Sequence, residues 1–139
     1  MLRLCLIVTT ALLGACNYRG YNAAKAGPAY PFAAHTTDTA QVQVFRDGTN
    51  ISLVNATATS WGAARIWVNQ RFSHRVKGLA AGQTLTLDLH DFWDEDGESF
   101  PAGGFLATRP AMPVRLVELR EDNAPDMIGF FAIPLTGEH

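Results

Sequence analysis

The sequence predicts an all-β domain over residues 40–139, and three observations support this prediction. Short runs of alternating apolar and polar residues recur at roughly 8 to 12-residue spacing. Turn-forming residues separate these runs. No window in this part sustains apolar residues at i, i+3, i+4 and i+7 over three turns, so amphipathic helices are not expected. About seven or eight short strands in some hundred residues favour an antiparallel β-sandwich.

Each strand is predicted from its own alternation. The predicted strands cover residues 42–45, 51–54, 66–68, 72–76, 84–89, 114–119 and 127–133. Asp47-Gly48 is a strong hairpin signal between the first two. Asn69-Gln70 is a tight connection between the next two. The clearest period of two lies at Leu85, Leu87 and Leu89.

The last strand, 127–133, carries apolar residues on both of its faces. Such a strand suits the middle of a sheet, and we expect it there. At a sheet edge it would instead be suited to pairing with another chain.

Three stretches resemble extracytoplasmic bacterial sandwiches of the immunoglobulin or fibronectin type III class. They are Val54-Asn55-Ala56-Thr57 to Trp61, then Arg65-Ile66-Trp67-Val68-Asn69, then Gly82-Gln83-Thr84-Leu85-Thr86-Leu87. The resemblance covers about a third of the chain and implies a fold class but no activity. The cysteine pair of antibody domains is missing, which excludes that subfamily. A small barrel is the alternative architecture.

The first sixteen residues have the pattern of an export signal. Arg3 supplies a positive charge, an apolar run follows, and Leu13-Gly14-Ala15-Cys16 places small residues before a cysteine. This resembles the lipobox of bacterial lipoproteins, which implies that residues 1–15 are a signal peptide and that Cys16 carries the lipid. The alternatives are an ordinary secretory signal and a membrane-spanning helix. The apolar run is shorter than the roughly 18 to 20 residues that a span needs.

Residues 16–39 show neither strand nor helix periodicity, so we expect the lipidated cysteine to be followed by a flexible linker about 25 Å from end to end. Its aromatic residues could alternatively dock on a partner or on the lipid surface. Asn17 follows the anchor cysteine. In enterobacterial sorting an Asp there signals retention in the inner membrane, so Asn favours the periplasmic face of the outer membrane.

Composition limits the class of protein. A formal net charge of −2 lacks the excess of basic residues that would suggest nucleic-acid binding. A hydrophobic content of 47% is too high for a disordered chain and allows one core. Cys5 and Cys16 are the two cysteines, so the mature chain would hold one thiol and no disulfide. We expect no cofactor.

An acidic and aromatic loop over residues 90–105 is a candidate ligand site. Its members are Asp91, Phe92, Trp93, Asp94, Asp96 and Glu98. Two interpretations are open. In the first, the acids are solvated and the aromatics pack beneath the loop; in the second, they line a groove for a glycan or peptide. A weaker alternative is calcium bound by Asp94, Asp96 and Glu98, although the spacing departs from that of an EF-hand.

A second candidate is an interaction patch formed by Arg65, Trp67, Asn69 and Arg71. If Ile66 and Val68 face the core, Trp67 points to the opposite face. There it would be either an exposed interface residue or a tryptophan covered by long side chains.

Catalytic motifs give little support for an enzyme. The chain has no Gly-x-Ser-x-Gly elbow, no His-Glu-x-x-His motif and no Cys-x-x-Cys motif. We therefore expect a membrane-anchored, non-enzymatic protein-binding or structural module of the cell envelope. The alternative is a glycan- or calcium-binding module that uses the 90–105 loop.

Overall fold

A computed structural model describes residues 20–134 of the chain. The predictions about the signal peptide, Cys16 and Asn17 lie outside these residues. The described part contains seven strands and three short 3-10 turns, with no α-helix among them. The all-β prediction is therefore confirmed.

All seven predicted strands are present, and their bounds differ from the prediction by a few residues. They are β1 (Thr39–Asp47), β2 (Asn50–Asn55), β3 (Ala64–Val68), β4 (Phe72–Val76), β5 (Thr84–Asp88), β6 (Val117–Glu121) and β7 (Ile128–Ile133). Strand β6 begins three residues later than expected. The amide nitrogens of Arg115 and Leu116 donate to the Asn69 side chain, which holds them away from a strand ladder.

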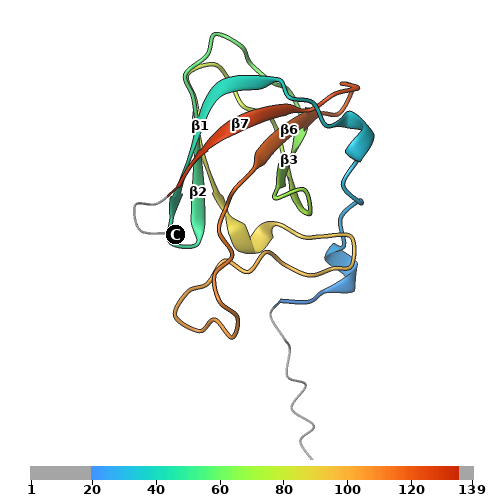
Figure 1. Cartoon of the computed structure of the whole chain (residues 1–139), viewed down its shortest axis with the longest axis vertical. Helices are drawn as coiled ribbons and strands as arrows, with labels where there is room; N and C mark the ends of the chain where they lie inside the picture. Colours follow the sequence, from blue (N-terminus) through green and yellow to red (C-terminus); the bar gives the residue numbers. More distant parts are fainter. Residues whose placement is uncertain (1–19, 135–139) are drawn as a thin grey trace, which may run out of the picture.

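The strands form one mixed sheet in the order β4-β3-β6-β7-β1-β2-β5. Only the β1–β7 pair is parallel among the described strands. Figure 1 shows that the sheet curls into a half-barrel, a shape compatible with a sandwich-like fold. Because β7 lies between β6 and β1, its expected place inside the sheet is confirmed.

Two hairpin turns follow from local backbone chemistry. The β1–β2 turn has Gly48 at φ 57°, a left-handed conformation that glycine adopts without strain. The β3–β4 turn has Asn69 at φ 53° and Gln70 at φ 56°, and the Arg71 amide closes it on the Val68 carbonyl. Positive φ at both central positions is the type I′ geometry that matches strand twist. The second turn lies at the predicted Asn69-Gln70 dipeptide. The first was predicted at Asp47-Gly48 and lies one residue later, at Gly48-Thr49, because Asp47 pairs with Asn50.

The main hydrophobic core lies against the concave face of the curled sheet. Alternate residues of the strands point into it, as the period-two pattern requires. Its fully buried members include Val42, Ile51, Leu53, Ile66, Leu79, Leu89, Phe92 and Leu119. Ile66 and Val68 belong to this core, so Trp67 does point to the opposite, outer face.

Residues 20–38, here called the strap, lie across the outer face instead of forming a flexible linker. They contain the 3-10 turns η1 (Ala23–Lys25) and η2 (Phe32–Ala34). Tyr30 and Ala34 are buried with Trp67 and Met127 in a second hydrophobic cluster. The expectation of a flexible linker is therefore wrong for the strap, because Tyr30 and Ala34 are buried against residues that lie far away in the sequence.

The strap is also held by its backbone. The amides of Asn22 and Gly27 donate to carbonyls of the 94–98 loop. The amide of Ser99 donates to the Gly20 carbonyl at 2.8 Å. Further along, the amides of Met127 and Gly129 donate to Ala34 and Asp38. Within residues 20–134, no helix combines the length and hydrophobicity needed to cross a membrane.

Candidate binding surfaces

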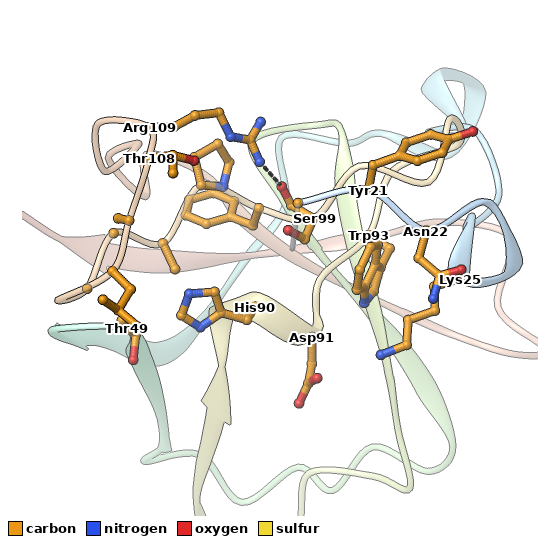
Figure 2. A pocket seen from close by; sticks show the side chains of 18 of the residues that line it. Tyr21, Asn22, Lys25, Thr49, His90, Asp91, Trp93, Ser99, Thr108 and Arg109 are labelled. Atoms are coloured by element: carbon orange, nitrogen blue, oxygen red, sulfur yellow. Dashed lines mark hydrogen bonds between the residues drawn. The ribbon is translucent and has the colours of Figure 1, made fainter. Parts of the chain in front are cut away.

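A groove of about 1180 Å³ opens at one end of the sheet, between the strap and the loop 101–109. Figure 2 shows Tyr21, Asn22 and Lys25 on the strap side, His90 and Asp91 at its base, and Thr108 and Arg109 opposite. Trp93 forms part of the wall, and the Lys25 ammonium lies 4.9 Å from the centre of its ring. The lining combines an aromatic wall with hydrogen-bonding groups, which suits a polar ligand with apolar faces.

The predicted ligand loop contributes to this groove only in part. Asp91 and Trp93 line it. Phe92 is fully buried and Phe100 is 1% exposed. These two aromatic side chains therefore pack beneath the loop, which was the first of the two interpretations. Asp94 is also buried, and it serves the loop rather than the groove.

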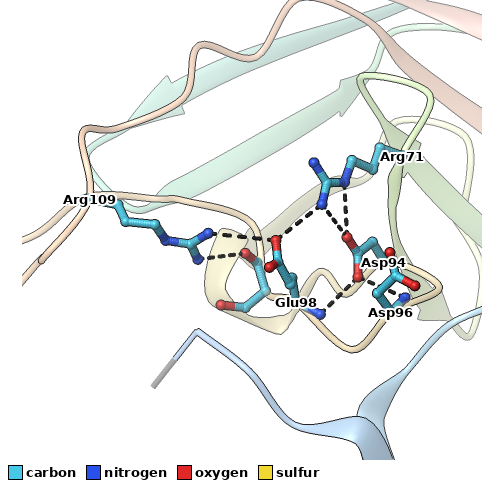
Figure 3. A network of polar contacts seen from close by, with 6 residues as sticks. Arg71, Asp94, Asp96, Glu98 and Arg109 are labelled. Carbon is cyan, nitrogen blue, oxygen red and sulfur yellow. Dashed lines mark hydrogen bonds and ion pairs between the residues drawn. The ribbon is translucent and has the colours of Figure 1, made fainter. Parts of the chain in front are cut away.

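Asp94 organises the 94–98 loop through both of its carboxylate oxygens. Oδ1 accepts the amides of Asp96 (3.0 Å) and Glu98 (2.8 Å). Oδ2 accepts Nε (2.9 Å) and Nη2 (2.7 Å) of Arg71, which makes a forked ion pair. Figure 3 shows how Arg71 also reaches Glu98, which in turn lies 3.8 Å from Nη1 of Arg109.

This bonding sets the charge of Asp94. Burial alone would raise the pKa of its carboxyl, but the Glu98 amide and the Arg71 guanidinium outweigh burial and lower the pKa below its usual 3.8. Asp94 is therefore an ionised structural residue.

The calcium alternative at Asp94, Asp96 and Glu98 is not supported by this geometry. All four hydrogen bonds to Asp94 would compete with a cation, and Arg71 already supplies the positive charge. No group of three or more His, Cys, Asp or Glu side chains in residues 20–134 is arranged to hold a metal.

The predicted patch Arg65, Trp67, Asn69 and Arg71 is not an exposed interaction surface. Trp67 is only 2% exposed, because the strap covers it and Tyr30 meets its ring edge to face at 5.3 Å. Arg65 donates to Ser73 Oγ at 3.0 Å, and burial lowers its pKa. Asn69 holds the 113–116 segment, and Arg71 is paired with Asp94. These side chains have structural roles.

The strap covers a polar cluster that the sequence analysis missed. Glu118 lies beside Trp67 across the β3–β6 pair and is 1% exposed. Its Oε2 accepts the Tyr30 hydroxyl at 2.8 Å, and its Oε1 lies 2.6 Å from His35 Nδ1. Burial and the bond to Glu118 raise the pKa of Tyr30 to about 12. Both partners of this glutamate come from the strap, so the cluster fastens the strap to the sheet.

An apolar strip remains exposed on the outer face beside the strap. It consists of Phe45 (40% exposed), Phe131 (49%) and Ile133 (38%) on the adjacent strands β1 and β7. Phe45 and Ile133 are direct partners in the parallel register. Apolar side chains that adjoin one another on an exposed sheet face form a surface suited to contact with a partner. The sequence indicates this strip through the apolar residues on both faces of β7.

His90 and Asp88 form an exposed pair near the groove, with Nδ1 2.8 Å from Oδ1. The same carboxylate accepts the amide of His90, so Asp88 caps a short 3-10 turn, η3 (Leu89–Asp91). In the described part of the chain, no serine, threonine or tyrosine hydroxyl is hydrogen-bonded to His90. The pair is therefore accounted for by its capping role.

Comparisons with protein-family models, with curated proteins and with solved structures found no match to this chain. The function is therefore argued from the residues themselves.

Proposed function

We propose that this chain is a lipoprotein of the cell envelope, acylated at Cys16, whose β domain is a non-enzymatic module that contacts an envelope partner. The observation that carries the proposal is the N-terminal pattern of Arg3, an apolar run and Leu13-Gly14-Ala15-Cys16. Removal of residues 1–15 and attachment of two or more acyl chains would hold the protein firmly to a bilayer.

The strap changes how such an anchor would hold the domain. Four residue steps separate Cys16 from Gly20, where the chain is already hydrogen-bonded to Ser99. Fully extended, these steps span at most about 14 Å. The domain would therefore lie at the membrane surface rather than on a long tether.

Metabolic labelling tests the anchor. Cells of the native host that are fed a labelled fatty acid should incorporate it into the wild-type protein and not into a Cys16→Ala variant. Wild type should fractionate with membranes, whereas the variant should lose the label and the membrane association. Labelling that is unchanged in the variant would contradict the proposal.

The apolar strip Phe45, Phe131 and Ile133 is the surface that supports protein contact. A photo-crosslinking residue placed at Phe131 should trap a discrete adduct in intact envelopes. The matched control is Thr84, which is exposed on the outer face of the edge strand β5. Adducts that are equally abundant at both positions, or absent from both, would contradict a partner at the strip.

The groove supports a second candidate function, which is glycan binding. Its aromatic wall at Trp93 and the hydrogen-bonding side chains of Asn22, His90 and Asp91 suit a saccharide. A glycan array probed with the purified protein should give signals that a Trp93→Ala variant loses. If the same signals persist in that variant, the groove is not the binding site.

A further inference from the structure

The loop between Ala102 and Met112 ends in an apolar tip. Gly103 (φ +80°) and Gly104 (φ +107°) turn the chain outward in conformations that favour glycine. The Ala107 amide then donates to the Gly104 carbonyl at 3.1 Å, which leaves Phe105 and Leu106 at the two central positions of the turn. Phe105 is 102% exposed and Leu106 is 74% exposed. Turn centres are usually Gly, Pro, Asn, Asp or Ser, so a Phe-Leu tip is unusual.

Hydrogen bonds fasten the base of this loop to the domain. The buried Arg46 guanidinium donates to the carbonyls of Ala102 (2.9 Å) and Met112 (2.6 Å). The amide of Met112 also donates to Pro101 at 2.8 Å. Hydrogen bonds therefore hold the loop where it leaves the domain and where it returns.

The tip lies at the same end of the molecule as the start of the strap. Gly20, Tyr21, Phe105 and Leu106 all line the one groove. Figure 1 shows the loop, in orange, and the start of the strap, in blue, at the same lower end of the molecule. A direct chain of hydrogen bonds joins them, because Arg109 donates to the Ser99 carbonyl and the Ser99 amide donates to Gly20.

We propose that Phe105 and Leu106 insert into the interfacial layer of the bilayer that holds Cys16, as a second membrane contact that orients the domain. This inference rests on the proposed lipid anchor. The anchor cysteine lies within about 14 Å of Gly20, so this end faces the bilayer. Interfacial segments bury their apolar side chains about 5–10 Å deep, which a protruding turn can reach.

The composition around the tip matches a lipid interface. No charged residue occurs between Ala102 and Thr108. Tyr21, 56% exposed, lies on the same rim, where an aromatic ring with a polar hydroxyl is favoured at headgroup level. Lys25 is exposed nearby and suits anionic headgroups. In this orientation the groove opens at the headgroup layer.

A single-thiol label tests the contact in the acylated protein. Once Cys5 has left with the signal and Cys16 is acylated, Leu106→Cys provides the only free thiol. Its matched control is Ala81→Cys, exposed in a loop bonded to Ser60 at the opposite end of the sheet. Each variant is labelled with an environment-sensitive fluorophore and reconstituted in phosphatidylethanolamine–phosphatidylglycerol vesicles. Phe105→Cys serves as a second tip position.

We expect the labels at 105 and 106 to lose iodide quenching and to be quenched by nitroxide-bearing lipids, whereas the label at 81 shows the reverse. Intact mass and vesicle flotation of the same samples report the anchor. Acylated, floating protein whose tip labels remain as open to iodide as the control would overturn the second contact alone. Protein without a lipid mass that does not float would overturn the anchor, and the second contact with it.

Discussion

Replacing Asp94 tests whether one buried carboxylate holds the 94–98 loop and, through it, the strap. Asp94→Ala removes the acceptor of two amides and the partner of Arg71. Hydrogen bonds to ionised groups contribute about 1.5–3 kcal/mol each, and removing one partner of a buried pair costs about 3–5 kcal/mol. Because the Arg71 side chain is half exposed and can rehydrate, we expect the low end of that range.

The expected loss for Asp94→Ala is about 3 kcal/mol of unfolding free energy, which corresponds to about 12 °C in Tm for a domain of this size. Asp94→Asn keeps an oxygen for the two amides and should cost about 1–2 kcal/mol. The matched control is Asp96→Ala, because Asp96 is exposed in the same loop and should change stability by about 0.5 kcal/mol or less. Urea denaturation followed by tryptophan fluorescence measures all three. A loss for Asp94→Ala no greater than that for Asp96→Ala would refute the reasoning.

The same residue predicts a dependence on pH. The pKa of Asp94 is lower in the folded state than its ordinary value of 3.8, so its contribution to stability is fully present above that value and is lost as the pH falls through the folded pKa. The difference between wild type and Asp94→Asn should be constant above roughly pH 5 and shrink below about pH 4. A difference that grows on acidification would contradict this sign.

Three further predictions concern the strap and the loop between Ala102 and Met112. The pKa of Tyr30 is raised from 10 to about 12, so its contribution to stability is present below pH 10 and lost between pH 10 and 12. Tyr30→Phe should remove the late step of a spectrophotometric tyrosine titration and cost about 1–2 kcal/mol, because Glu118 loses a hydrogen bond. Gly97→Ala would place a Cβ 2.7 Å from the Asn22 carbonyl oxygen. It should therefore cost at least about 1 kcal/mol more unfolding free energy than Gly82→Ala, because Gly82 shares the left-handed conformation but has no atom within 4 Å of its Cβ position. Equal losses of unfolding free energy in urea would contradict the packing of the strap against Gly97. Arg46→Met removes the hydrogen bonds to the Ala102 and Met112 carbonyls and should speed amide hydrogen exchange between these residues by tenfold or more, because a loss of about 1.4 kcal/mol in the free energy of opening corresponds to tenfold. Unchanged exchange rates would show that these hydrogen bonds do not hold the loop.

The strands could be predicted because their signal is local. Alternation at Leu85 and Leu87, and at Ile66 and Val68, records which side of a pleated strand faces the core. The turn at Asn69, where φ is positive, is likewise predicted from the local Asn69-Gln70 dipeptide. Such signals need no knowledge of what lies across the fold.

The strap and its cluster could not be predicted for the opposite reason. Tyr30 is buried by Trp67, which lies far along the chain, and the strap has no period that marks this contact. Glu118 alternates with buried residues of β6 and so has the pattern of a solvent-facing residue, yet the strap covers it. Asp94 has the appearance of one surface acid among several until Arg71 is placed beside it. By contrast, the exposed tip has a local signal in the sequence, because the apolar pair Phe105-Leu106 directly follows two glycines.

The intact mass of the protein purified from membranes of its native host tests the central claim most directly. The account predicts a chain that begins at Cys16 and carries the added mass of a diacylglyceryl group, with or without a further acyl chain. A chain that retains residues 1–15, or that has an unmodified Cys16, would contradict it.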